Sequence, residues 1–294
     1  MKWDPEAAQR LERVPFFIRK KVKRQIEEYV AAQGKDIVTS ADVTAARQHF
    51  TGGSTLTTGQ EELSQLDLDR IRELVEKGVP TEALDTKYIK FRLCGGAAGC
   101  PLNLMDQMKP YAARLAEIAR EQGLETFLAG SHDGPVLFHH QFKITLSGCP
   151  NNCSQPQIAD FAVIGQARPS VTGAKCNGCE LCVKACKENA LTVDDNGPHF
   201  DDALCLLCGD CTRYCRKEVI VNGPERYRVL IGGKLGRHPH LAIPLALEAA
   251  WEEVEDLLRK TIVLYQTQAL DGERFGDLVQ RLGDDRVIKL IREQ

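Results

Sequence analysis

The sequence predicts a mixed α+β fold, in which a cysteine-rich module is flanked by segments of alternating strands and helices. Between about residues 66 and 172, and again after about residue 224, short β-branched runs alternate with longer runs of helical periodicity. All 12 cysteines lie between Cys94 and Cys215, at spacings typical of iron–sulfur ligands. A separate helical domain is predicted to precede these segments.

The composition excludes several classes of protein. With 294 residues, 43% of them hydrophobic, the chain is long enough for about two folded domains. A net charge of −3 provides no basic field for nucleic acid, and no apolar run approaches the roughly 20 residues that span a bilayer. The N-terminal segment is charged and lacks the apolar core of a signal peptide. We therefore expect a cytoplasmic protein that neither binds nucleic acid nor spans a membrane.

Residues 1–55 are predicted to form the helical domain. Apolar residues recur at helical intervals from Trp3 to Val30, and Gly34 provides a helix end. Thr39 or Ser40 is expected to cap a third helix that continues to about residue 50. A Gly- and Thr-rich linker at 51–65 and a short helix at 67–78 should follow.

Further elements are predicted on both sides of the cysteine-rich module from hydrophobic periodicity. Strands are expected at 88–93, 136–146, 160–164 and 227–231. Helices are expected from near Pro110 to Gly123, at 243–265 and at 272–292.

Eight cysteines form a duplicated motif with the spacing C-x2-C-x2-C-x3-C. This spacing is typical of bacterial ferredoxins with two [4Fe–4S] clusters, in which the fourth cysteine of each run ligates the other cluster. Zinc sites normally use two separated C-x2-C pairs instead, so we favour iron–sulfur clusters. One cluster is assigned Cys176, Cys179, Cys182 and Cys215, and the other Cys205, Cys208, Cys211 and Cys186. Lys187 and Arg216 replace the proline that usually follows each fourth cysteine. Their charge is either ordinary surface charge, or it raises the potential of a cluster or steers an acidic electron donor.

The remaining four cysteines form two pairs with different spacings. Cys94 and Cys100 are separated by five residues, and Cys149 and Cys153 by three. Four thiolates are the ligand set of one further [4Fe–4S] cluster. Three clusters therefore use all 12 cysteines, and no thiol remains for a disulfide.

These two spacings, with the segment Ser-Gly-Cys-Pro-Asn-Asn-Cys at 147–153, resemble the cluster motif of the sirohaem sulfite and nitrite reductases. The resemblance implies that Cys153 also bridges to the sirohaem iron and that Asn151 and Asn152 pack against the cluster. In the anaerobic sulfite reductases and their dissimilatory relatives, a ferredoxin interrupts the sirohaem domain, and a G-G-K-x-G-R-x-P segment resumes it, here at 232–239. The implied organisation is a reductase domain at 66–172 and 224–294, with the ferredoxin inserted at 173–223.

The N-terminal helical domain resembles another redox family. Its pattern W-x3-A-x3-L-x2-V-P-x-F-x-R-x2-V, starting at Trp3, is similar to the small C-terminal domain of the dark-operative protochlorophyllide reductase B subunit. That domain also occurs joined to other redox modules, so the resemblance does not indicate a substrate.

The sirohaem reductase resemblance also implies catalytic residues. Lys143 matches the second lysine of a family K-F-K segment that faces the substrate anion, whereas Gln141 replaces the first lysine. Residues 141 and 143 would share one face of a strand. His140, or its neighbour His139, is then a candidate for the missing charge and for proton donation. With Cys153 as the bridging ligand, these residues form the expected catalytic set.

Sirohaem carries eight carboxylates, so its pocket must be basic. Besides Asn151, Asn152 and Cys153, the expected contacts are the cations nearest to the motifs. These cations are Lys87, Lys90, Arg92, Lys234 and Arg237, the last two in the Gly-rich segment.

The expected function is the six-electron reduction of sulfite to sulfide through the ferredoxin clusters. No G-x-G-x-x-G follows a strand, so a ferredoxin or a flavoprotein is the expected electron donor. The region before Cys94 shows no match to the family's first half-domain, so a second copy or a partner subunit should complete the sirohaem pocket. The alternatives are an electron-transfer subunit without sirohaem and a reductase of nitrite or of another sulfur compound.

Overall fold

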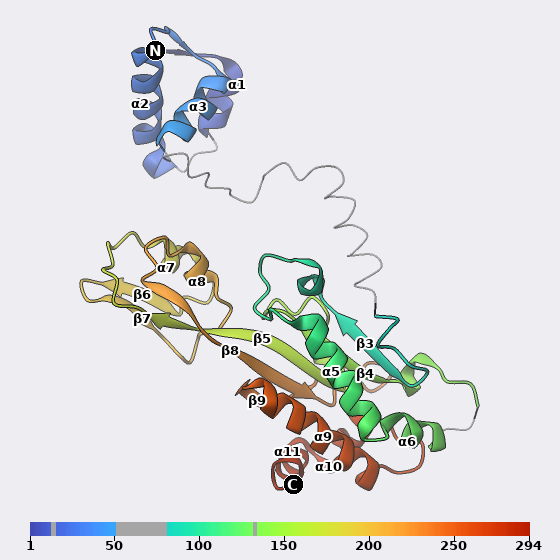
Figure 1. Cartoon of the computed structure of the whole chain (residues 1–294). Coiled ribbons are helices and arrows are strands. Elements are labelled where there is room, and N and C mark those ends of the chain that lie inside the picture. Colours follow the sequence, from blue (N-terminus) through green and yellow to red (C-terminus); the bar gives the residue numbers. More distant parts are fainter. Residues whose placement is uncertain (13–15, 51–80, 132–133) are drawn as a thin grey trace. The chain divides into compact units, whose positions relative to one another are not determined.

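The computed structural model describes residues 1–12, 16–50, 81–131 and 134–294 (Figure 1). Two compact units are formed, residues 1–69 and 70–294. The linker predicted at 51–65 and the helix predicted at 67–78 lie outside the described residues. Among the helices that are described, none is long and apolar enough to cross a membrane.

The N-terminal unit is a small helical fold, with its helices at α1 (Pro5–Glu12), α2 (Phe16–Ala32) and α3 (Ser40–Phe50). A short parallel pair joins β1 (Lys2–Trp3) to β2 (Ile37–Val38). Thr39 caps α3, because its Oγ1 accepts the N–H of Asp42 at 3.3 Å while Oδ2 of Asp42 accepts the N–H of Thr39 at 3.0 Å. The third helix therefore begins where the sequence predicts it.

A five-stranded mixed sheet forms the second unit, with the strand order β3-β4-β5-β8-β9. The strands are β3 (Ile89–Leu93), β4 (Phe142–Ser147), β5 (Phe161–Val171), β8 (Ile220–Ile231) and β9 (Ile243–Ala249). The first three run parallel to one another, and β8 and β9 are antiparallel to their neighbours. The mixed sheet with helices agrees with the predicted α+β class.

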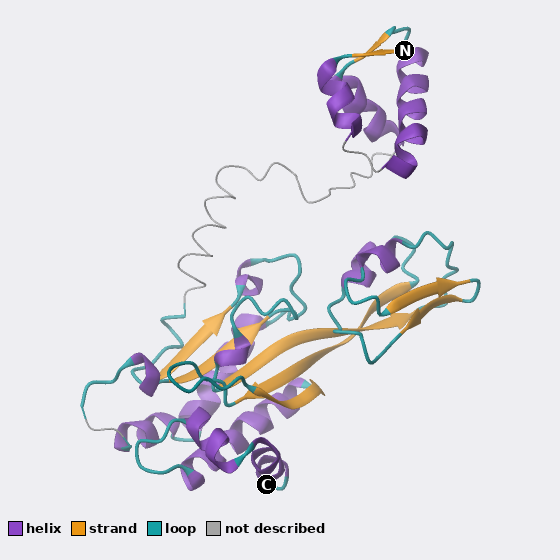
Figure 2. Cartoon of the chain, turned by 180° about the vertical axis from the view of Figure 1, so that it is seen from behind, coloured by secondary structure: helices purple, strands orange, loops and turns teal. Residues whose placement is uncertain are grey.

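Helices cover one face of this sheet (Figures 1 and 2). They are α5 (Met108–Glu121), α6 (Leu124–Gly130), α9 (Trp251–Gln268), α10 (Phe275–Leu282) and α11 (Asp284–Arg292). The core between the layers contains Phe91, Leu115, Ile144 and Phe161. Alternate strand residues point away from the helices, which places Lys90, Arg92 and Lys143 on the opposite face.

The segment between β5 and β8 contains α7 (Leu181–Ala185), β6 (Leu191–Asp194), β7 (Gly197–Phe200) and α8 (Asp210–Tyr214). The antiparallel pair of β5 and β8 extends beyond the sheet and carries this segment (Figure 1). Arg168 on β5 links the segment to the sheet, because its guanidinium binds Asp202 at 2.7 Å and Glu248 on β9 at 2.9 Å.

Strands β5 and β8 are longer than the predicted strands, and three predicted elements are interrupted or partly of another type. The strand predicted at 136–146 begins only at Phe142, because residues 138–140 form the 3-10 helix η2 (Phe138–His140). The helix predicted at 243–265 begins at Trp251, because the preceding segment pairs with β8 as strand β9. The helix predicted at 272–292 is divided into α10 and α11 at Gly283, whose φ is +85°.

Candidate functional site

The two cysteine pairs outside the duplicated motif follow neighbouring parallel strands. Cys94 follows β3 and caps the 3-10 helix η1 (Gly95–Ala98), while Cys149 and Cys153 follow β4. Because parallel strands end at the same edge of a sheet, the two loops meet there, and the N–H of Cys94 donates to the carbonyl of Leu146 at 3.1 Å. The pKa of Cys94 is raised by burial and also by its neighbours Cys153 and Cys100. The structure thus brings together the four thiols predicted to bind the cluster outside the duplicated motif.

Backbone amides are directed at the sulfur of Cys94. Its Sγ accepts the N–H of Gly148 at 3.1 Å and that of Gly96 at 3.3 Å. Burial raises the pKa of Cys94, and these two hydrogen bonds lower it. Burial also raises the pKa of Cys149. Since a metal ligand must be a thiolate, iron would supply the positive charge that offsets this burial.

Glycine is required at two positions around this thiol. A Cβ at Gly148 would lie 2.0 Å from Oδ1 of Asn103, and a Cβ at Gly96 would lie 2.7 Å from the same atom. Asn103 is fixed in turn, because its Nδ2 donates to the carbonyl of Met105 at 2.8 Å. Sequence analysis did not identify Asn103, because no local pattern links it to the cysteines.

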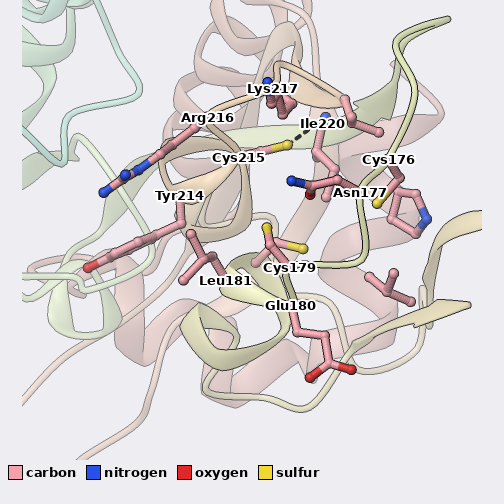
Figure 3. A pocket seen from close by; sticks show the side chains of 14 residues that line it. Cys176, Asn177, Cys179, Glu180, Leu181, Tyr214, Cys215, Arg216, Lys217 and Ile220 are labelled. Carbon is pink, nitrogen blue, oxygen red and sulfur yellow. Dashed lines mark hydrogen bonds between the residues drawn. The ribbon is translucent and has the colours of Figure 1, made fainter. Parts of the chain in front are cut away.

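The duplicated motif forms two separate pockets. One pocket of about 250 Å³ is lined by the thiols of Cys176, Cys179, Cys182 and Cys215. Figure 3 shows this pocket, with the labelled thiols pointing into it. The second pocket, of about 80 Å³, is lined by Cys186, Cys205, Cys208 and Cys211. Each pocket contains three cysteines of one run and the fourth of the other run, which are the two sets predicted from the spacing.

All 12 thiols are free of disulfides, and several accept backbone N–H groups. Cys186 accepts from Ala190 at 3.3 Å, and Cys215 accepts from Ile220 at 3.3 Å. Burial raises the pKa of Cys211 to about 12. Among the described residues, no three His, Cys, Asp or Glu side chains converge as the ligands of a single ion do. A cubane takes one thiolate on each of its irons, so its ligands are more widely separated.

Predicted cations line a third cavity on the sheet face opposite the helices. Lys90 lies beside Lys143 in the β3–β4 register, and Arg92 lies beside Thr145. All four residues line this cavity, which has a volume of about 240 Å³, and Phe138 and Leu235 also contribute to its wall. The pairing of β3 with β4 thus collects three of the predicted anion-binding side chains.

The three cations have different partners. The Lys143 ammonium lies 4.1 Å from the ring centroid of Phe138, and burial lowers the pKa of Lys143. Lys90 pairs with Asp85 at 2.9 Å, and Arg92 donates to Oε1 of Gln155.

Other predicted residues lie outside this cavity lining. The side-chain amide of Gln141 donates to the carbonyl of Lys87 at 3.1 Å. His140 lies in η2, where its Nδ1 accepts the N–H of Leu137 at 3.1 Å. The Lys87 ammonium lies 5.1 Å from the ring centroid of Tyr88.

The Gly-rich segment reaches the cavity through Leu235, which follows Lys234 and lies two residues before Arg237. Lys234 is only 4% exposed, and its ammonium forms an ion pair with Asp277. Arg237 is exposed in the turn. Neither of these two cations is among the described residues that line the cavity with Lys90, Arg92 and Lys143.

Three buried polar atoms have no hydrogen-bond partner among the described residues. They are Oδ1 of Asn152, Oε1 of Gln166 and Nε of Arg228. An unpaired buried polar atom costs about 1–3 kcal/mol, so a bound group that supplied partners would be stabilised here. Gln166 and Arg228 were missed because charged and polar residues alternate on any strand with a solvated face.

Asp160 is a further buried group that the sequence did not single out. It is 3% exposed, and its Oδ2 accepts the N–H of Lys143 at 2.8 Å. Burial raises its pKa to about 6, although the neighbouring Lys143 and Arg274 lower it. A carboxyl group therefore lies directly behind the strand that carries Lys143.

Gly148→Ala should remove the cluster of the Cys94 set, because the new Cβ collides with Asn103 and displaces the amide that binds Cys94. Iron analysis should show a loss of about four irons per chain. Gly130→Ala is the matched control, since no atom lies within 4 Å of its Cβ position. Full iron content in Gly148→Ala would contradict this account of the loop.

Asp160→Asn should stabilise the protein at neutral pH. The folded-state pKa of about 6 is above the ordinary 3.8, so the native state holds the proton more tightly and the free energy of unfolding falls as pH rises from about 4 to 6. Asparagine keeps the acceptor without this cost, which is at most about 3 kcal/mol. Thermal midpoints should diverge between pH 4 and 6 and stay apart above pH 6, whereas exposed Asp195→Asn should show no such divergence. A difference in thermal midpoint between Asp160→Asn and the unmodified protein that does not change with pH would contradict the raised pKa of Asp160.

Comparisons with known proteins agree with this geometry. The family model described as "Nitrite and sulphite reductase 4Fe-4S domain" matches residues 129–294, and the "Proto-chlorophyllide reductase 57 kD subunit" model matches residues 3–47. The coenzyme F420-dependent sulfite reductase of Methanocaldococcus jannaschii is 29% identical over 227 residues, which cover 76% of this chain and 34% of that protein. The alpha subunit of the dissimilatory-type sulfite reductase of Allochromatium vinosum is 25% identical, over 65% of this chain and 48% of that protein.

A solved structure shows the same fold. The crystal structure of dissimilatory sulfite reductase I matches with a TM-score of 0.50 and 18% identity, over 77% of this chain and 57% of that one. The chain spans between a third and a half of the length of the two relatives named above. The first family model covers more than half of the sequence, so the chain belongs to the nitrite and sulphite reductase 4Fe-4S domain family, as the resemblance of its cysteine motif predicted.

Proposed function

We propose that this chain is a cytoplasmic iron–sulfur oxidoreductase that reduces sulfite to sulfide. The observation that supports this most directly is the joint position of the Cys94 and Cys149 loops and the cation-lined cavity, both built on β3 and β4. Sulfite is the proposed substrate because the relatives of M. jannaschii and A. vinosum are named sulfite reductases. Nitrite and other sulfur oxyanions carry similar charge and are the competing substrates.

The chain would hold three [4Fe–4S] clusters. Each of the three sets of four thiols fits one cubane in number and in chemistry. We propose that residues 173–223 form a two-cluster ferredoxin domain within a reductase domain made of 66–172 and 224–294. Residues 1–55 form a separate helical domain in this proposal, and its role does not enter the reaction below.

The open face of the sheet fits a polyanionic tetrapyrrole such as sirohaem. Lys90, Arg92 and Lys143 would bind carboxylates, and the unpaired N–H of Arg228 would gain an acceptor. Cys153 is an exposed thiol in the loop after β4 and would help to hold the tetrapyrrole. Lys234 is not included, because it is buried, does not line this cavity and is paired with Asp277.

When bound, sirohaem would supply the iron that binds sulfite and accepts electrons from the cluster. The chain's own contribution is charge and protons. Lys143 would attract the anion, and burial lowers the pKa of its Nζ, which favours proton release. Phe138 over this ammonium excludes water from one side.

The wall of the cavity supports the proposal that another surface completes it. Phe138 is 72% exposed and Leu235 is 55% exposed, and both line the cavity. Large apolar side chains beside an anion site would be desolvated if this face were covered by a second copy or by a partner subunit. We propose such an assembly, with a ferredoxin or a flavoprotein as electron donor.

One observation favours an alternative function, an electron-transfer subunit that lacks sirohaem. Lys90 and Arg92 already have partners in Asp85 and Gln155, so the cavity could remain without an anionic ligand.

The visible spectrum of the anaerobically purified protein distinguishes the two functions. We expect Soret and long-wavelength bands of sirohaem, about 13 irons per chain and sulfite turnover with reduced methyl viologen. A spectrum with only the broad iron–sulfur shoulder, and about 12 irons, would instead support the electron-transfer subunit.

Lys143→Gln tests the anion site. Removing a charge-assisted hydrogen bond worth about 1.5–3 kcal/mol should lower kcat/KM for sulfite roughly ten- to hundredfold. Lys109→Gln on α5, an exposed lysine above the other face of the sheet, should leave the rate unchanged. Equal effects of the two variants would exclude a specific role for Lys143.

A further inference from the structure

The two pockets of the duplicated motif have different surroundings. The pocket of Cys205, Cys208, Cys211 and Cys186 is also lined by Pro150 and Asn151. These two residues directly follow Cys149 of the reductase cluster set. The pocket of Cys176, Cys179, Cys182 and Cys215 is lined, among the described residues, only by residues between Cys176 and Ile220. The pocket of Cys205, Cys208, Cys211 and Cys186 therefore shares a wall with the Cys149 loop, and the pocket of Cys176, Cys179, Cys182 and Cys215 does not.

Two further contacts support this asymmetry. The N–H of Ala167 on β5 donates to the carbonyl of Leu207 at 2.9 Å, beside a β-bridge to Cys208. The N–H of Leu104 donates to the carbonyl of Gly148 at 2.6 Å, and its Cδ2 lies 3.2 Å from the Cβ position of Gly209. Leu104 thus touches both the Gly148–Cys149 turn and the loop that carries Cys208.

The pocket of Cys176, Cys179, Cys182 and Cys215 has exposed residues in its wall. Cys179 is an exposed thiol, and Tyr214 in the same wall is 52% exposed. Arg216 and Lys217 are also exposed there, and Figure 3 shows Tyr214 and Arg216 extending away from the thiols. Lys187, the counterpart of Arg216, lies in the wall of the other pocket. The two cations that replace the usual prolines are therefore at different ends of the module.

We propose that electrons enter at the outer cluster, which is bound by Cys176, Cys179, Cys182 and Cys215. They pass next to the inner cluster, which is bound by Cys205, Cys208, Cys211 and Cys186. From the inner cluster they pass across Pro150 and Asn151 to the cluster of the Cys149 loop. This order rests on the proposed function, because it assumes that all three clusters are present. Each step transfers one electron, so that the donor cluster is oxidised, the acceptor cluster is reduced and no bond is made or broken. The electrons come from a reduced ferredoxin or flavoprotein that docks at the outer cluster.

Position determines this order because electron tunnelling slows steeply with distance. The contacts of Leu104 and Ala167 hold the loop that carries Cys208 close to the Cys149 loop. The ion pairs of Arg168 with Asp202 and Glu248 fix the orientation of the module. No comparable contact with the Cys149 loop involves the outer pocket among the described residues.

Magnetic coupling between reduced clusters tests the order in the full-length protein. Cys208→Ala removes a ligand of the inner cluster, and Cys179→Ala removes a ligand of the outer one. In electron paramagnetic resonance of the dithionite-reduced protein, Cys208→Ala should lower the half-saturation power of the Cys149-loop cluster severalfold. Cys179→Ala is the matched control and should leave that power nearly unchanged. The reverse pattern would overturn the proposed order.

Serine variants keep the test decisive if an alanine variant loses every cluster. Serine can still bind iron but shifts the potential of its cluster. In a reductive titration, the broadening of the Cys149-loop cluster signal should follow the redox state of the inner cluster. Cys208→Ser should therefore shift the potential at which the broadening appears, and Cys179→Ser should not. A shift caused by Cys179→Ser alone would refute the order.

These measurements separate failure of the order from failure of the proposed function. The coupling depends only on the clusters, so a protein without sirohaem still reports the order. A protein that contains about eight irons and no signal from the Cys149 loop would refute the three-cluster proposal itself, and the proposed order with it.

Discussion

The parallel pairing of β3 with β4 is the constraint on which the candidate site depends. Both strands end at one edge of the sheet, and this brings the Cys94 loop to the Cys149 loop. The same register sets Lys90 beside Lys143 on the face that the helices leave open. A slip of one residue would turn these lysines into the helix layer, so one set of backbone hydrogen bonds fixes both the cluster and the anion site.

Charge on the open face is balanced from within the fold. Asp160 is buried behind Lys143, where it accepts a backbone N–H and has a raised pKa. Buried atoms of Asn152, Gln166 and Arg228 lack partners on the part of the chain that is described. A packed core normally pairs such atoms, so this face combines cationic charge with unmet hydrogen bonds. The cations of this face and the unpaired N–H of Arg228 are suited to binding an anion, whereas the amide oxygens of Asn152 and Gln166 would need a donor group.

The long antiparallel pair of β5 and β8 connects the two kinds of cysteine site. It belongs to the central sheet at one end and carries the cysteine-rich segment at the other. Arg168 secures this arm through Asp202 and Glu248. This one pair of strands therefore sets the distance between the ferredoxin-type pockets and the Cys149 loop. That distance governs the rate of electron transfer between them.

The sequence by itself determined the features that are local. Spacing assigned eight cysteines to two sets, including the exchanged fourth cysteines, because each run of about ten residues must enclose one cubane, and the four remaining cysteines formed the third set. It also identified the family, the α+β class and the Thr39 cap. Only the tertiary structure decided which pocket adjoins the Cys149 loop, that Lys234 is paired with Asp277, and that 243–249 is an edge strand rather than a helix. These outcomes depend on partners far away in the sequence, and hydrophobic periodicity contains no information about which distant segment will pack against a residue.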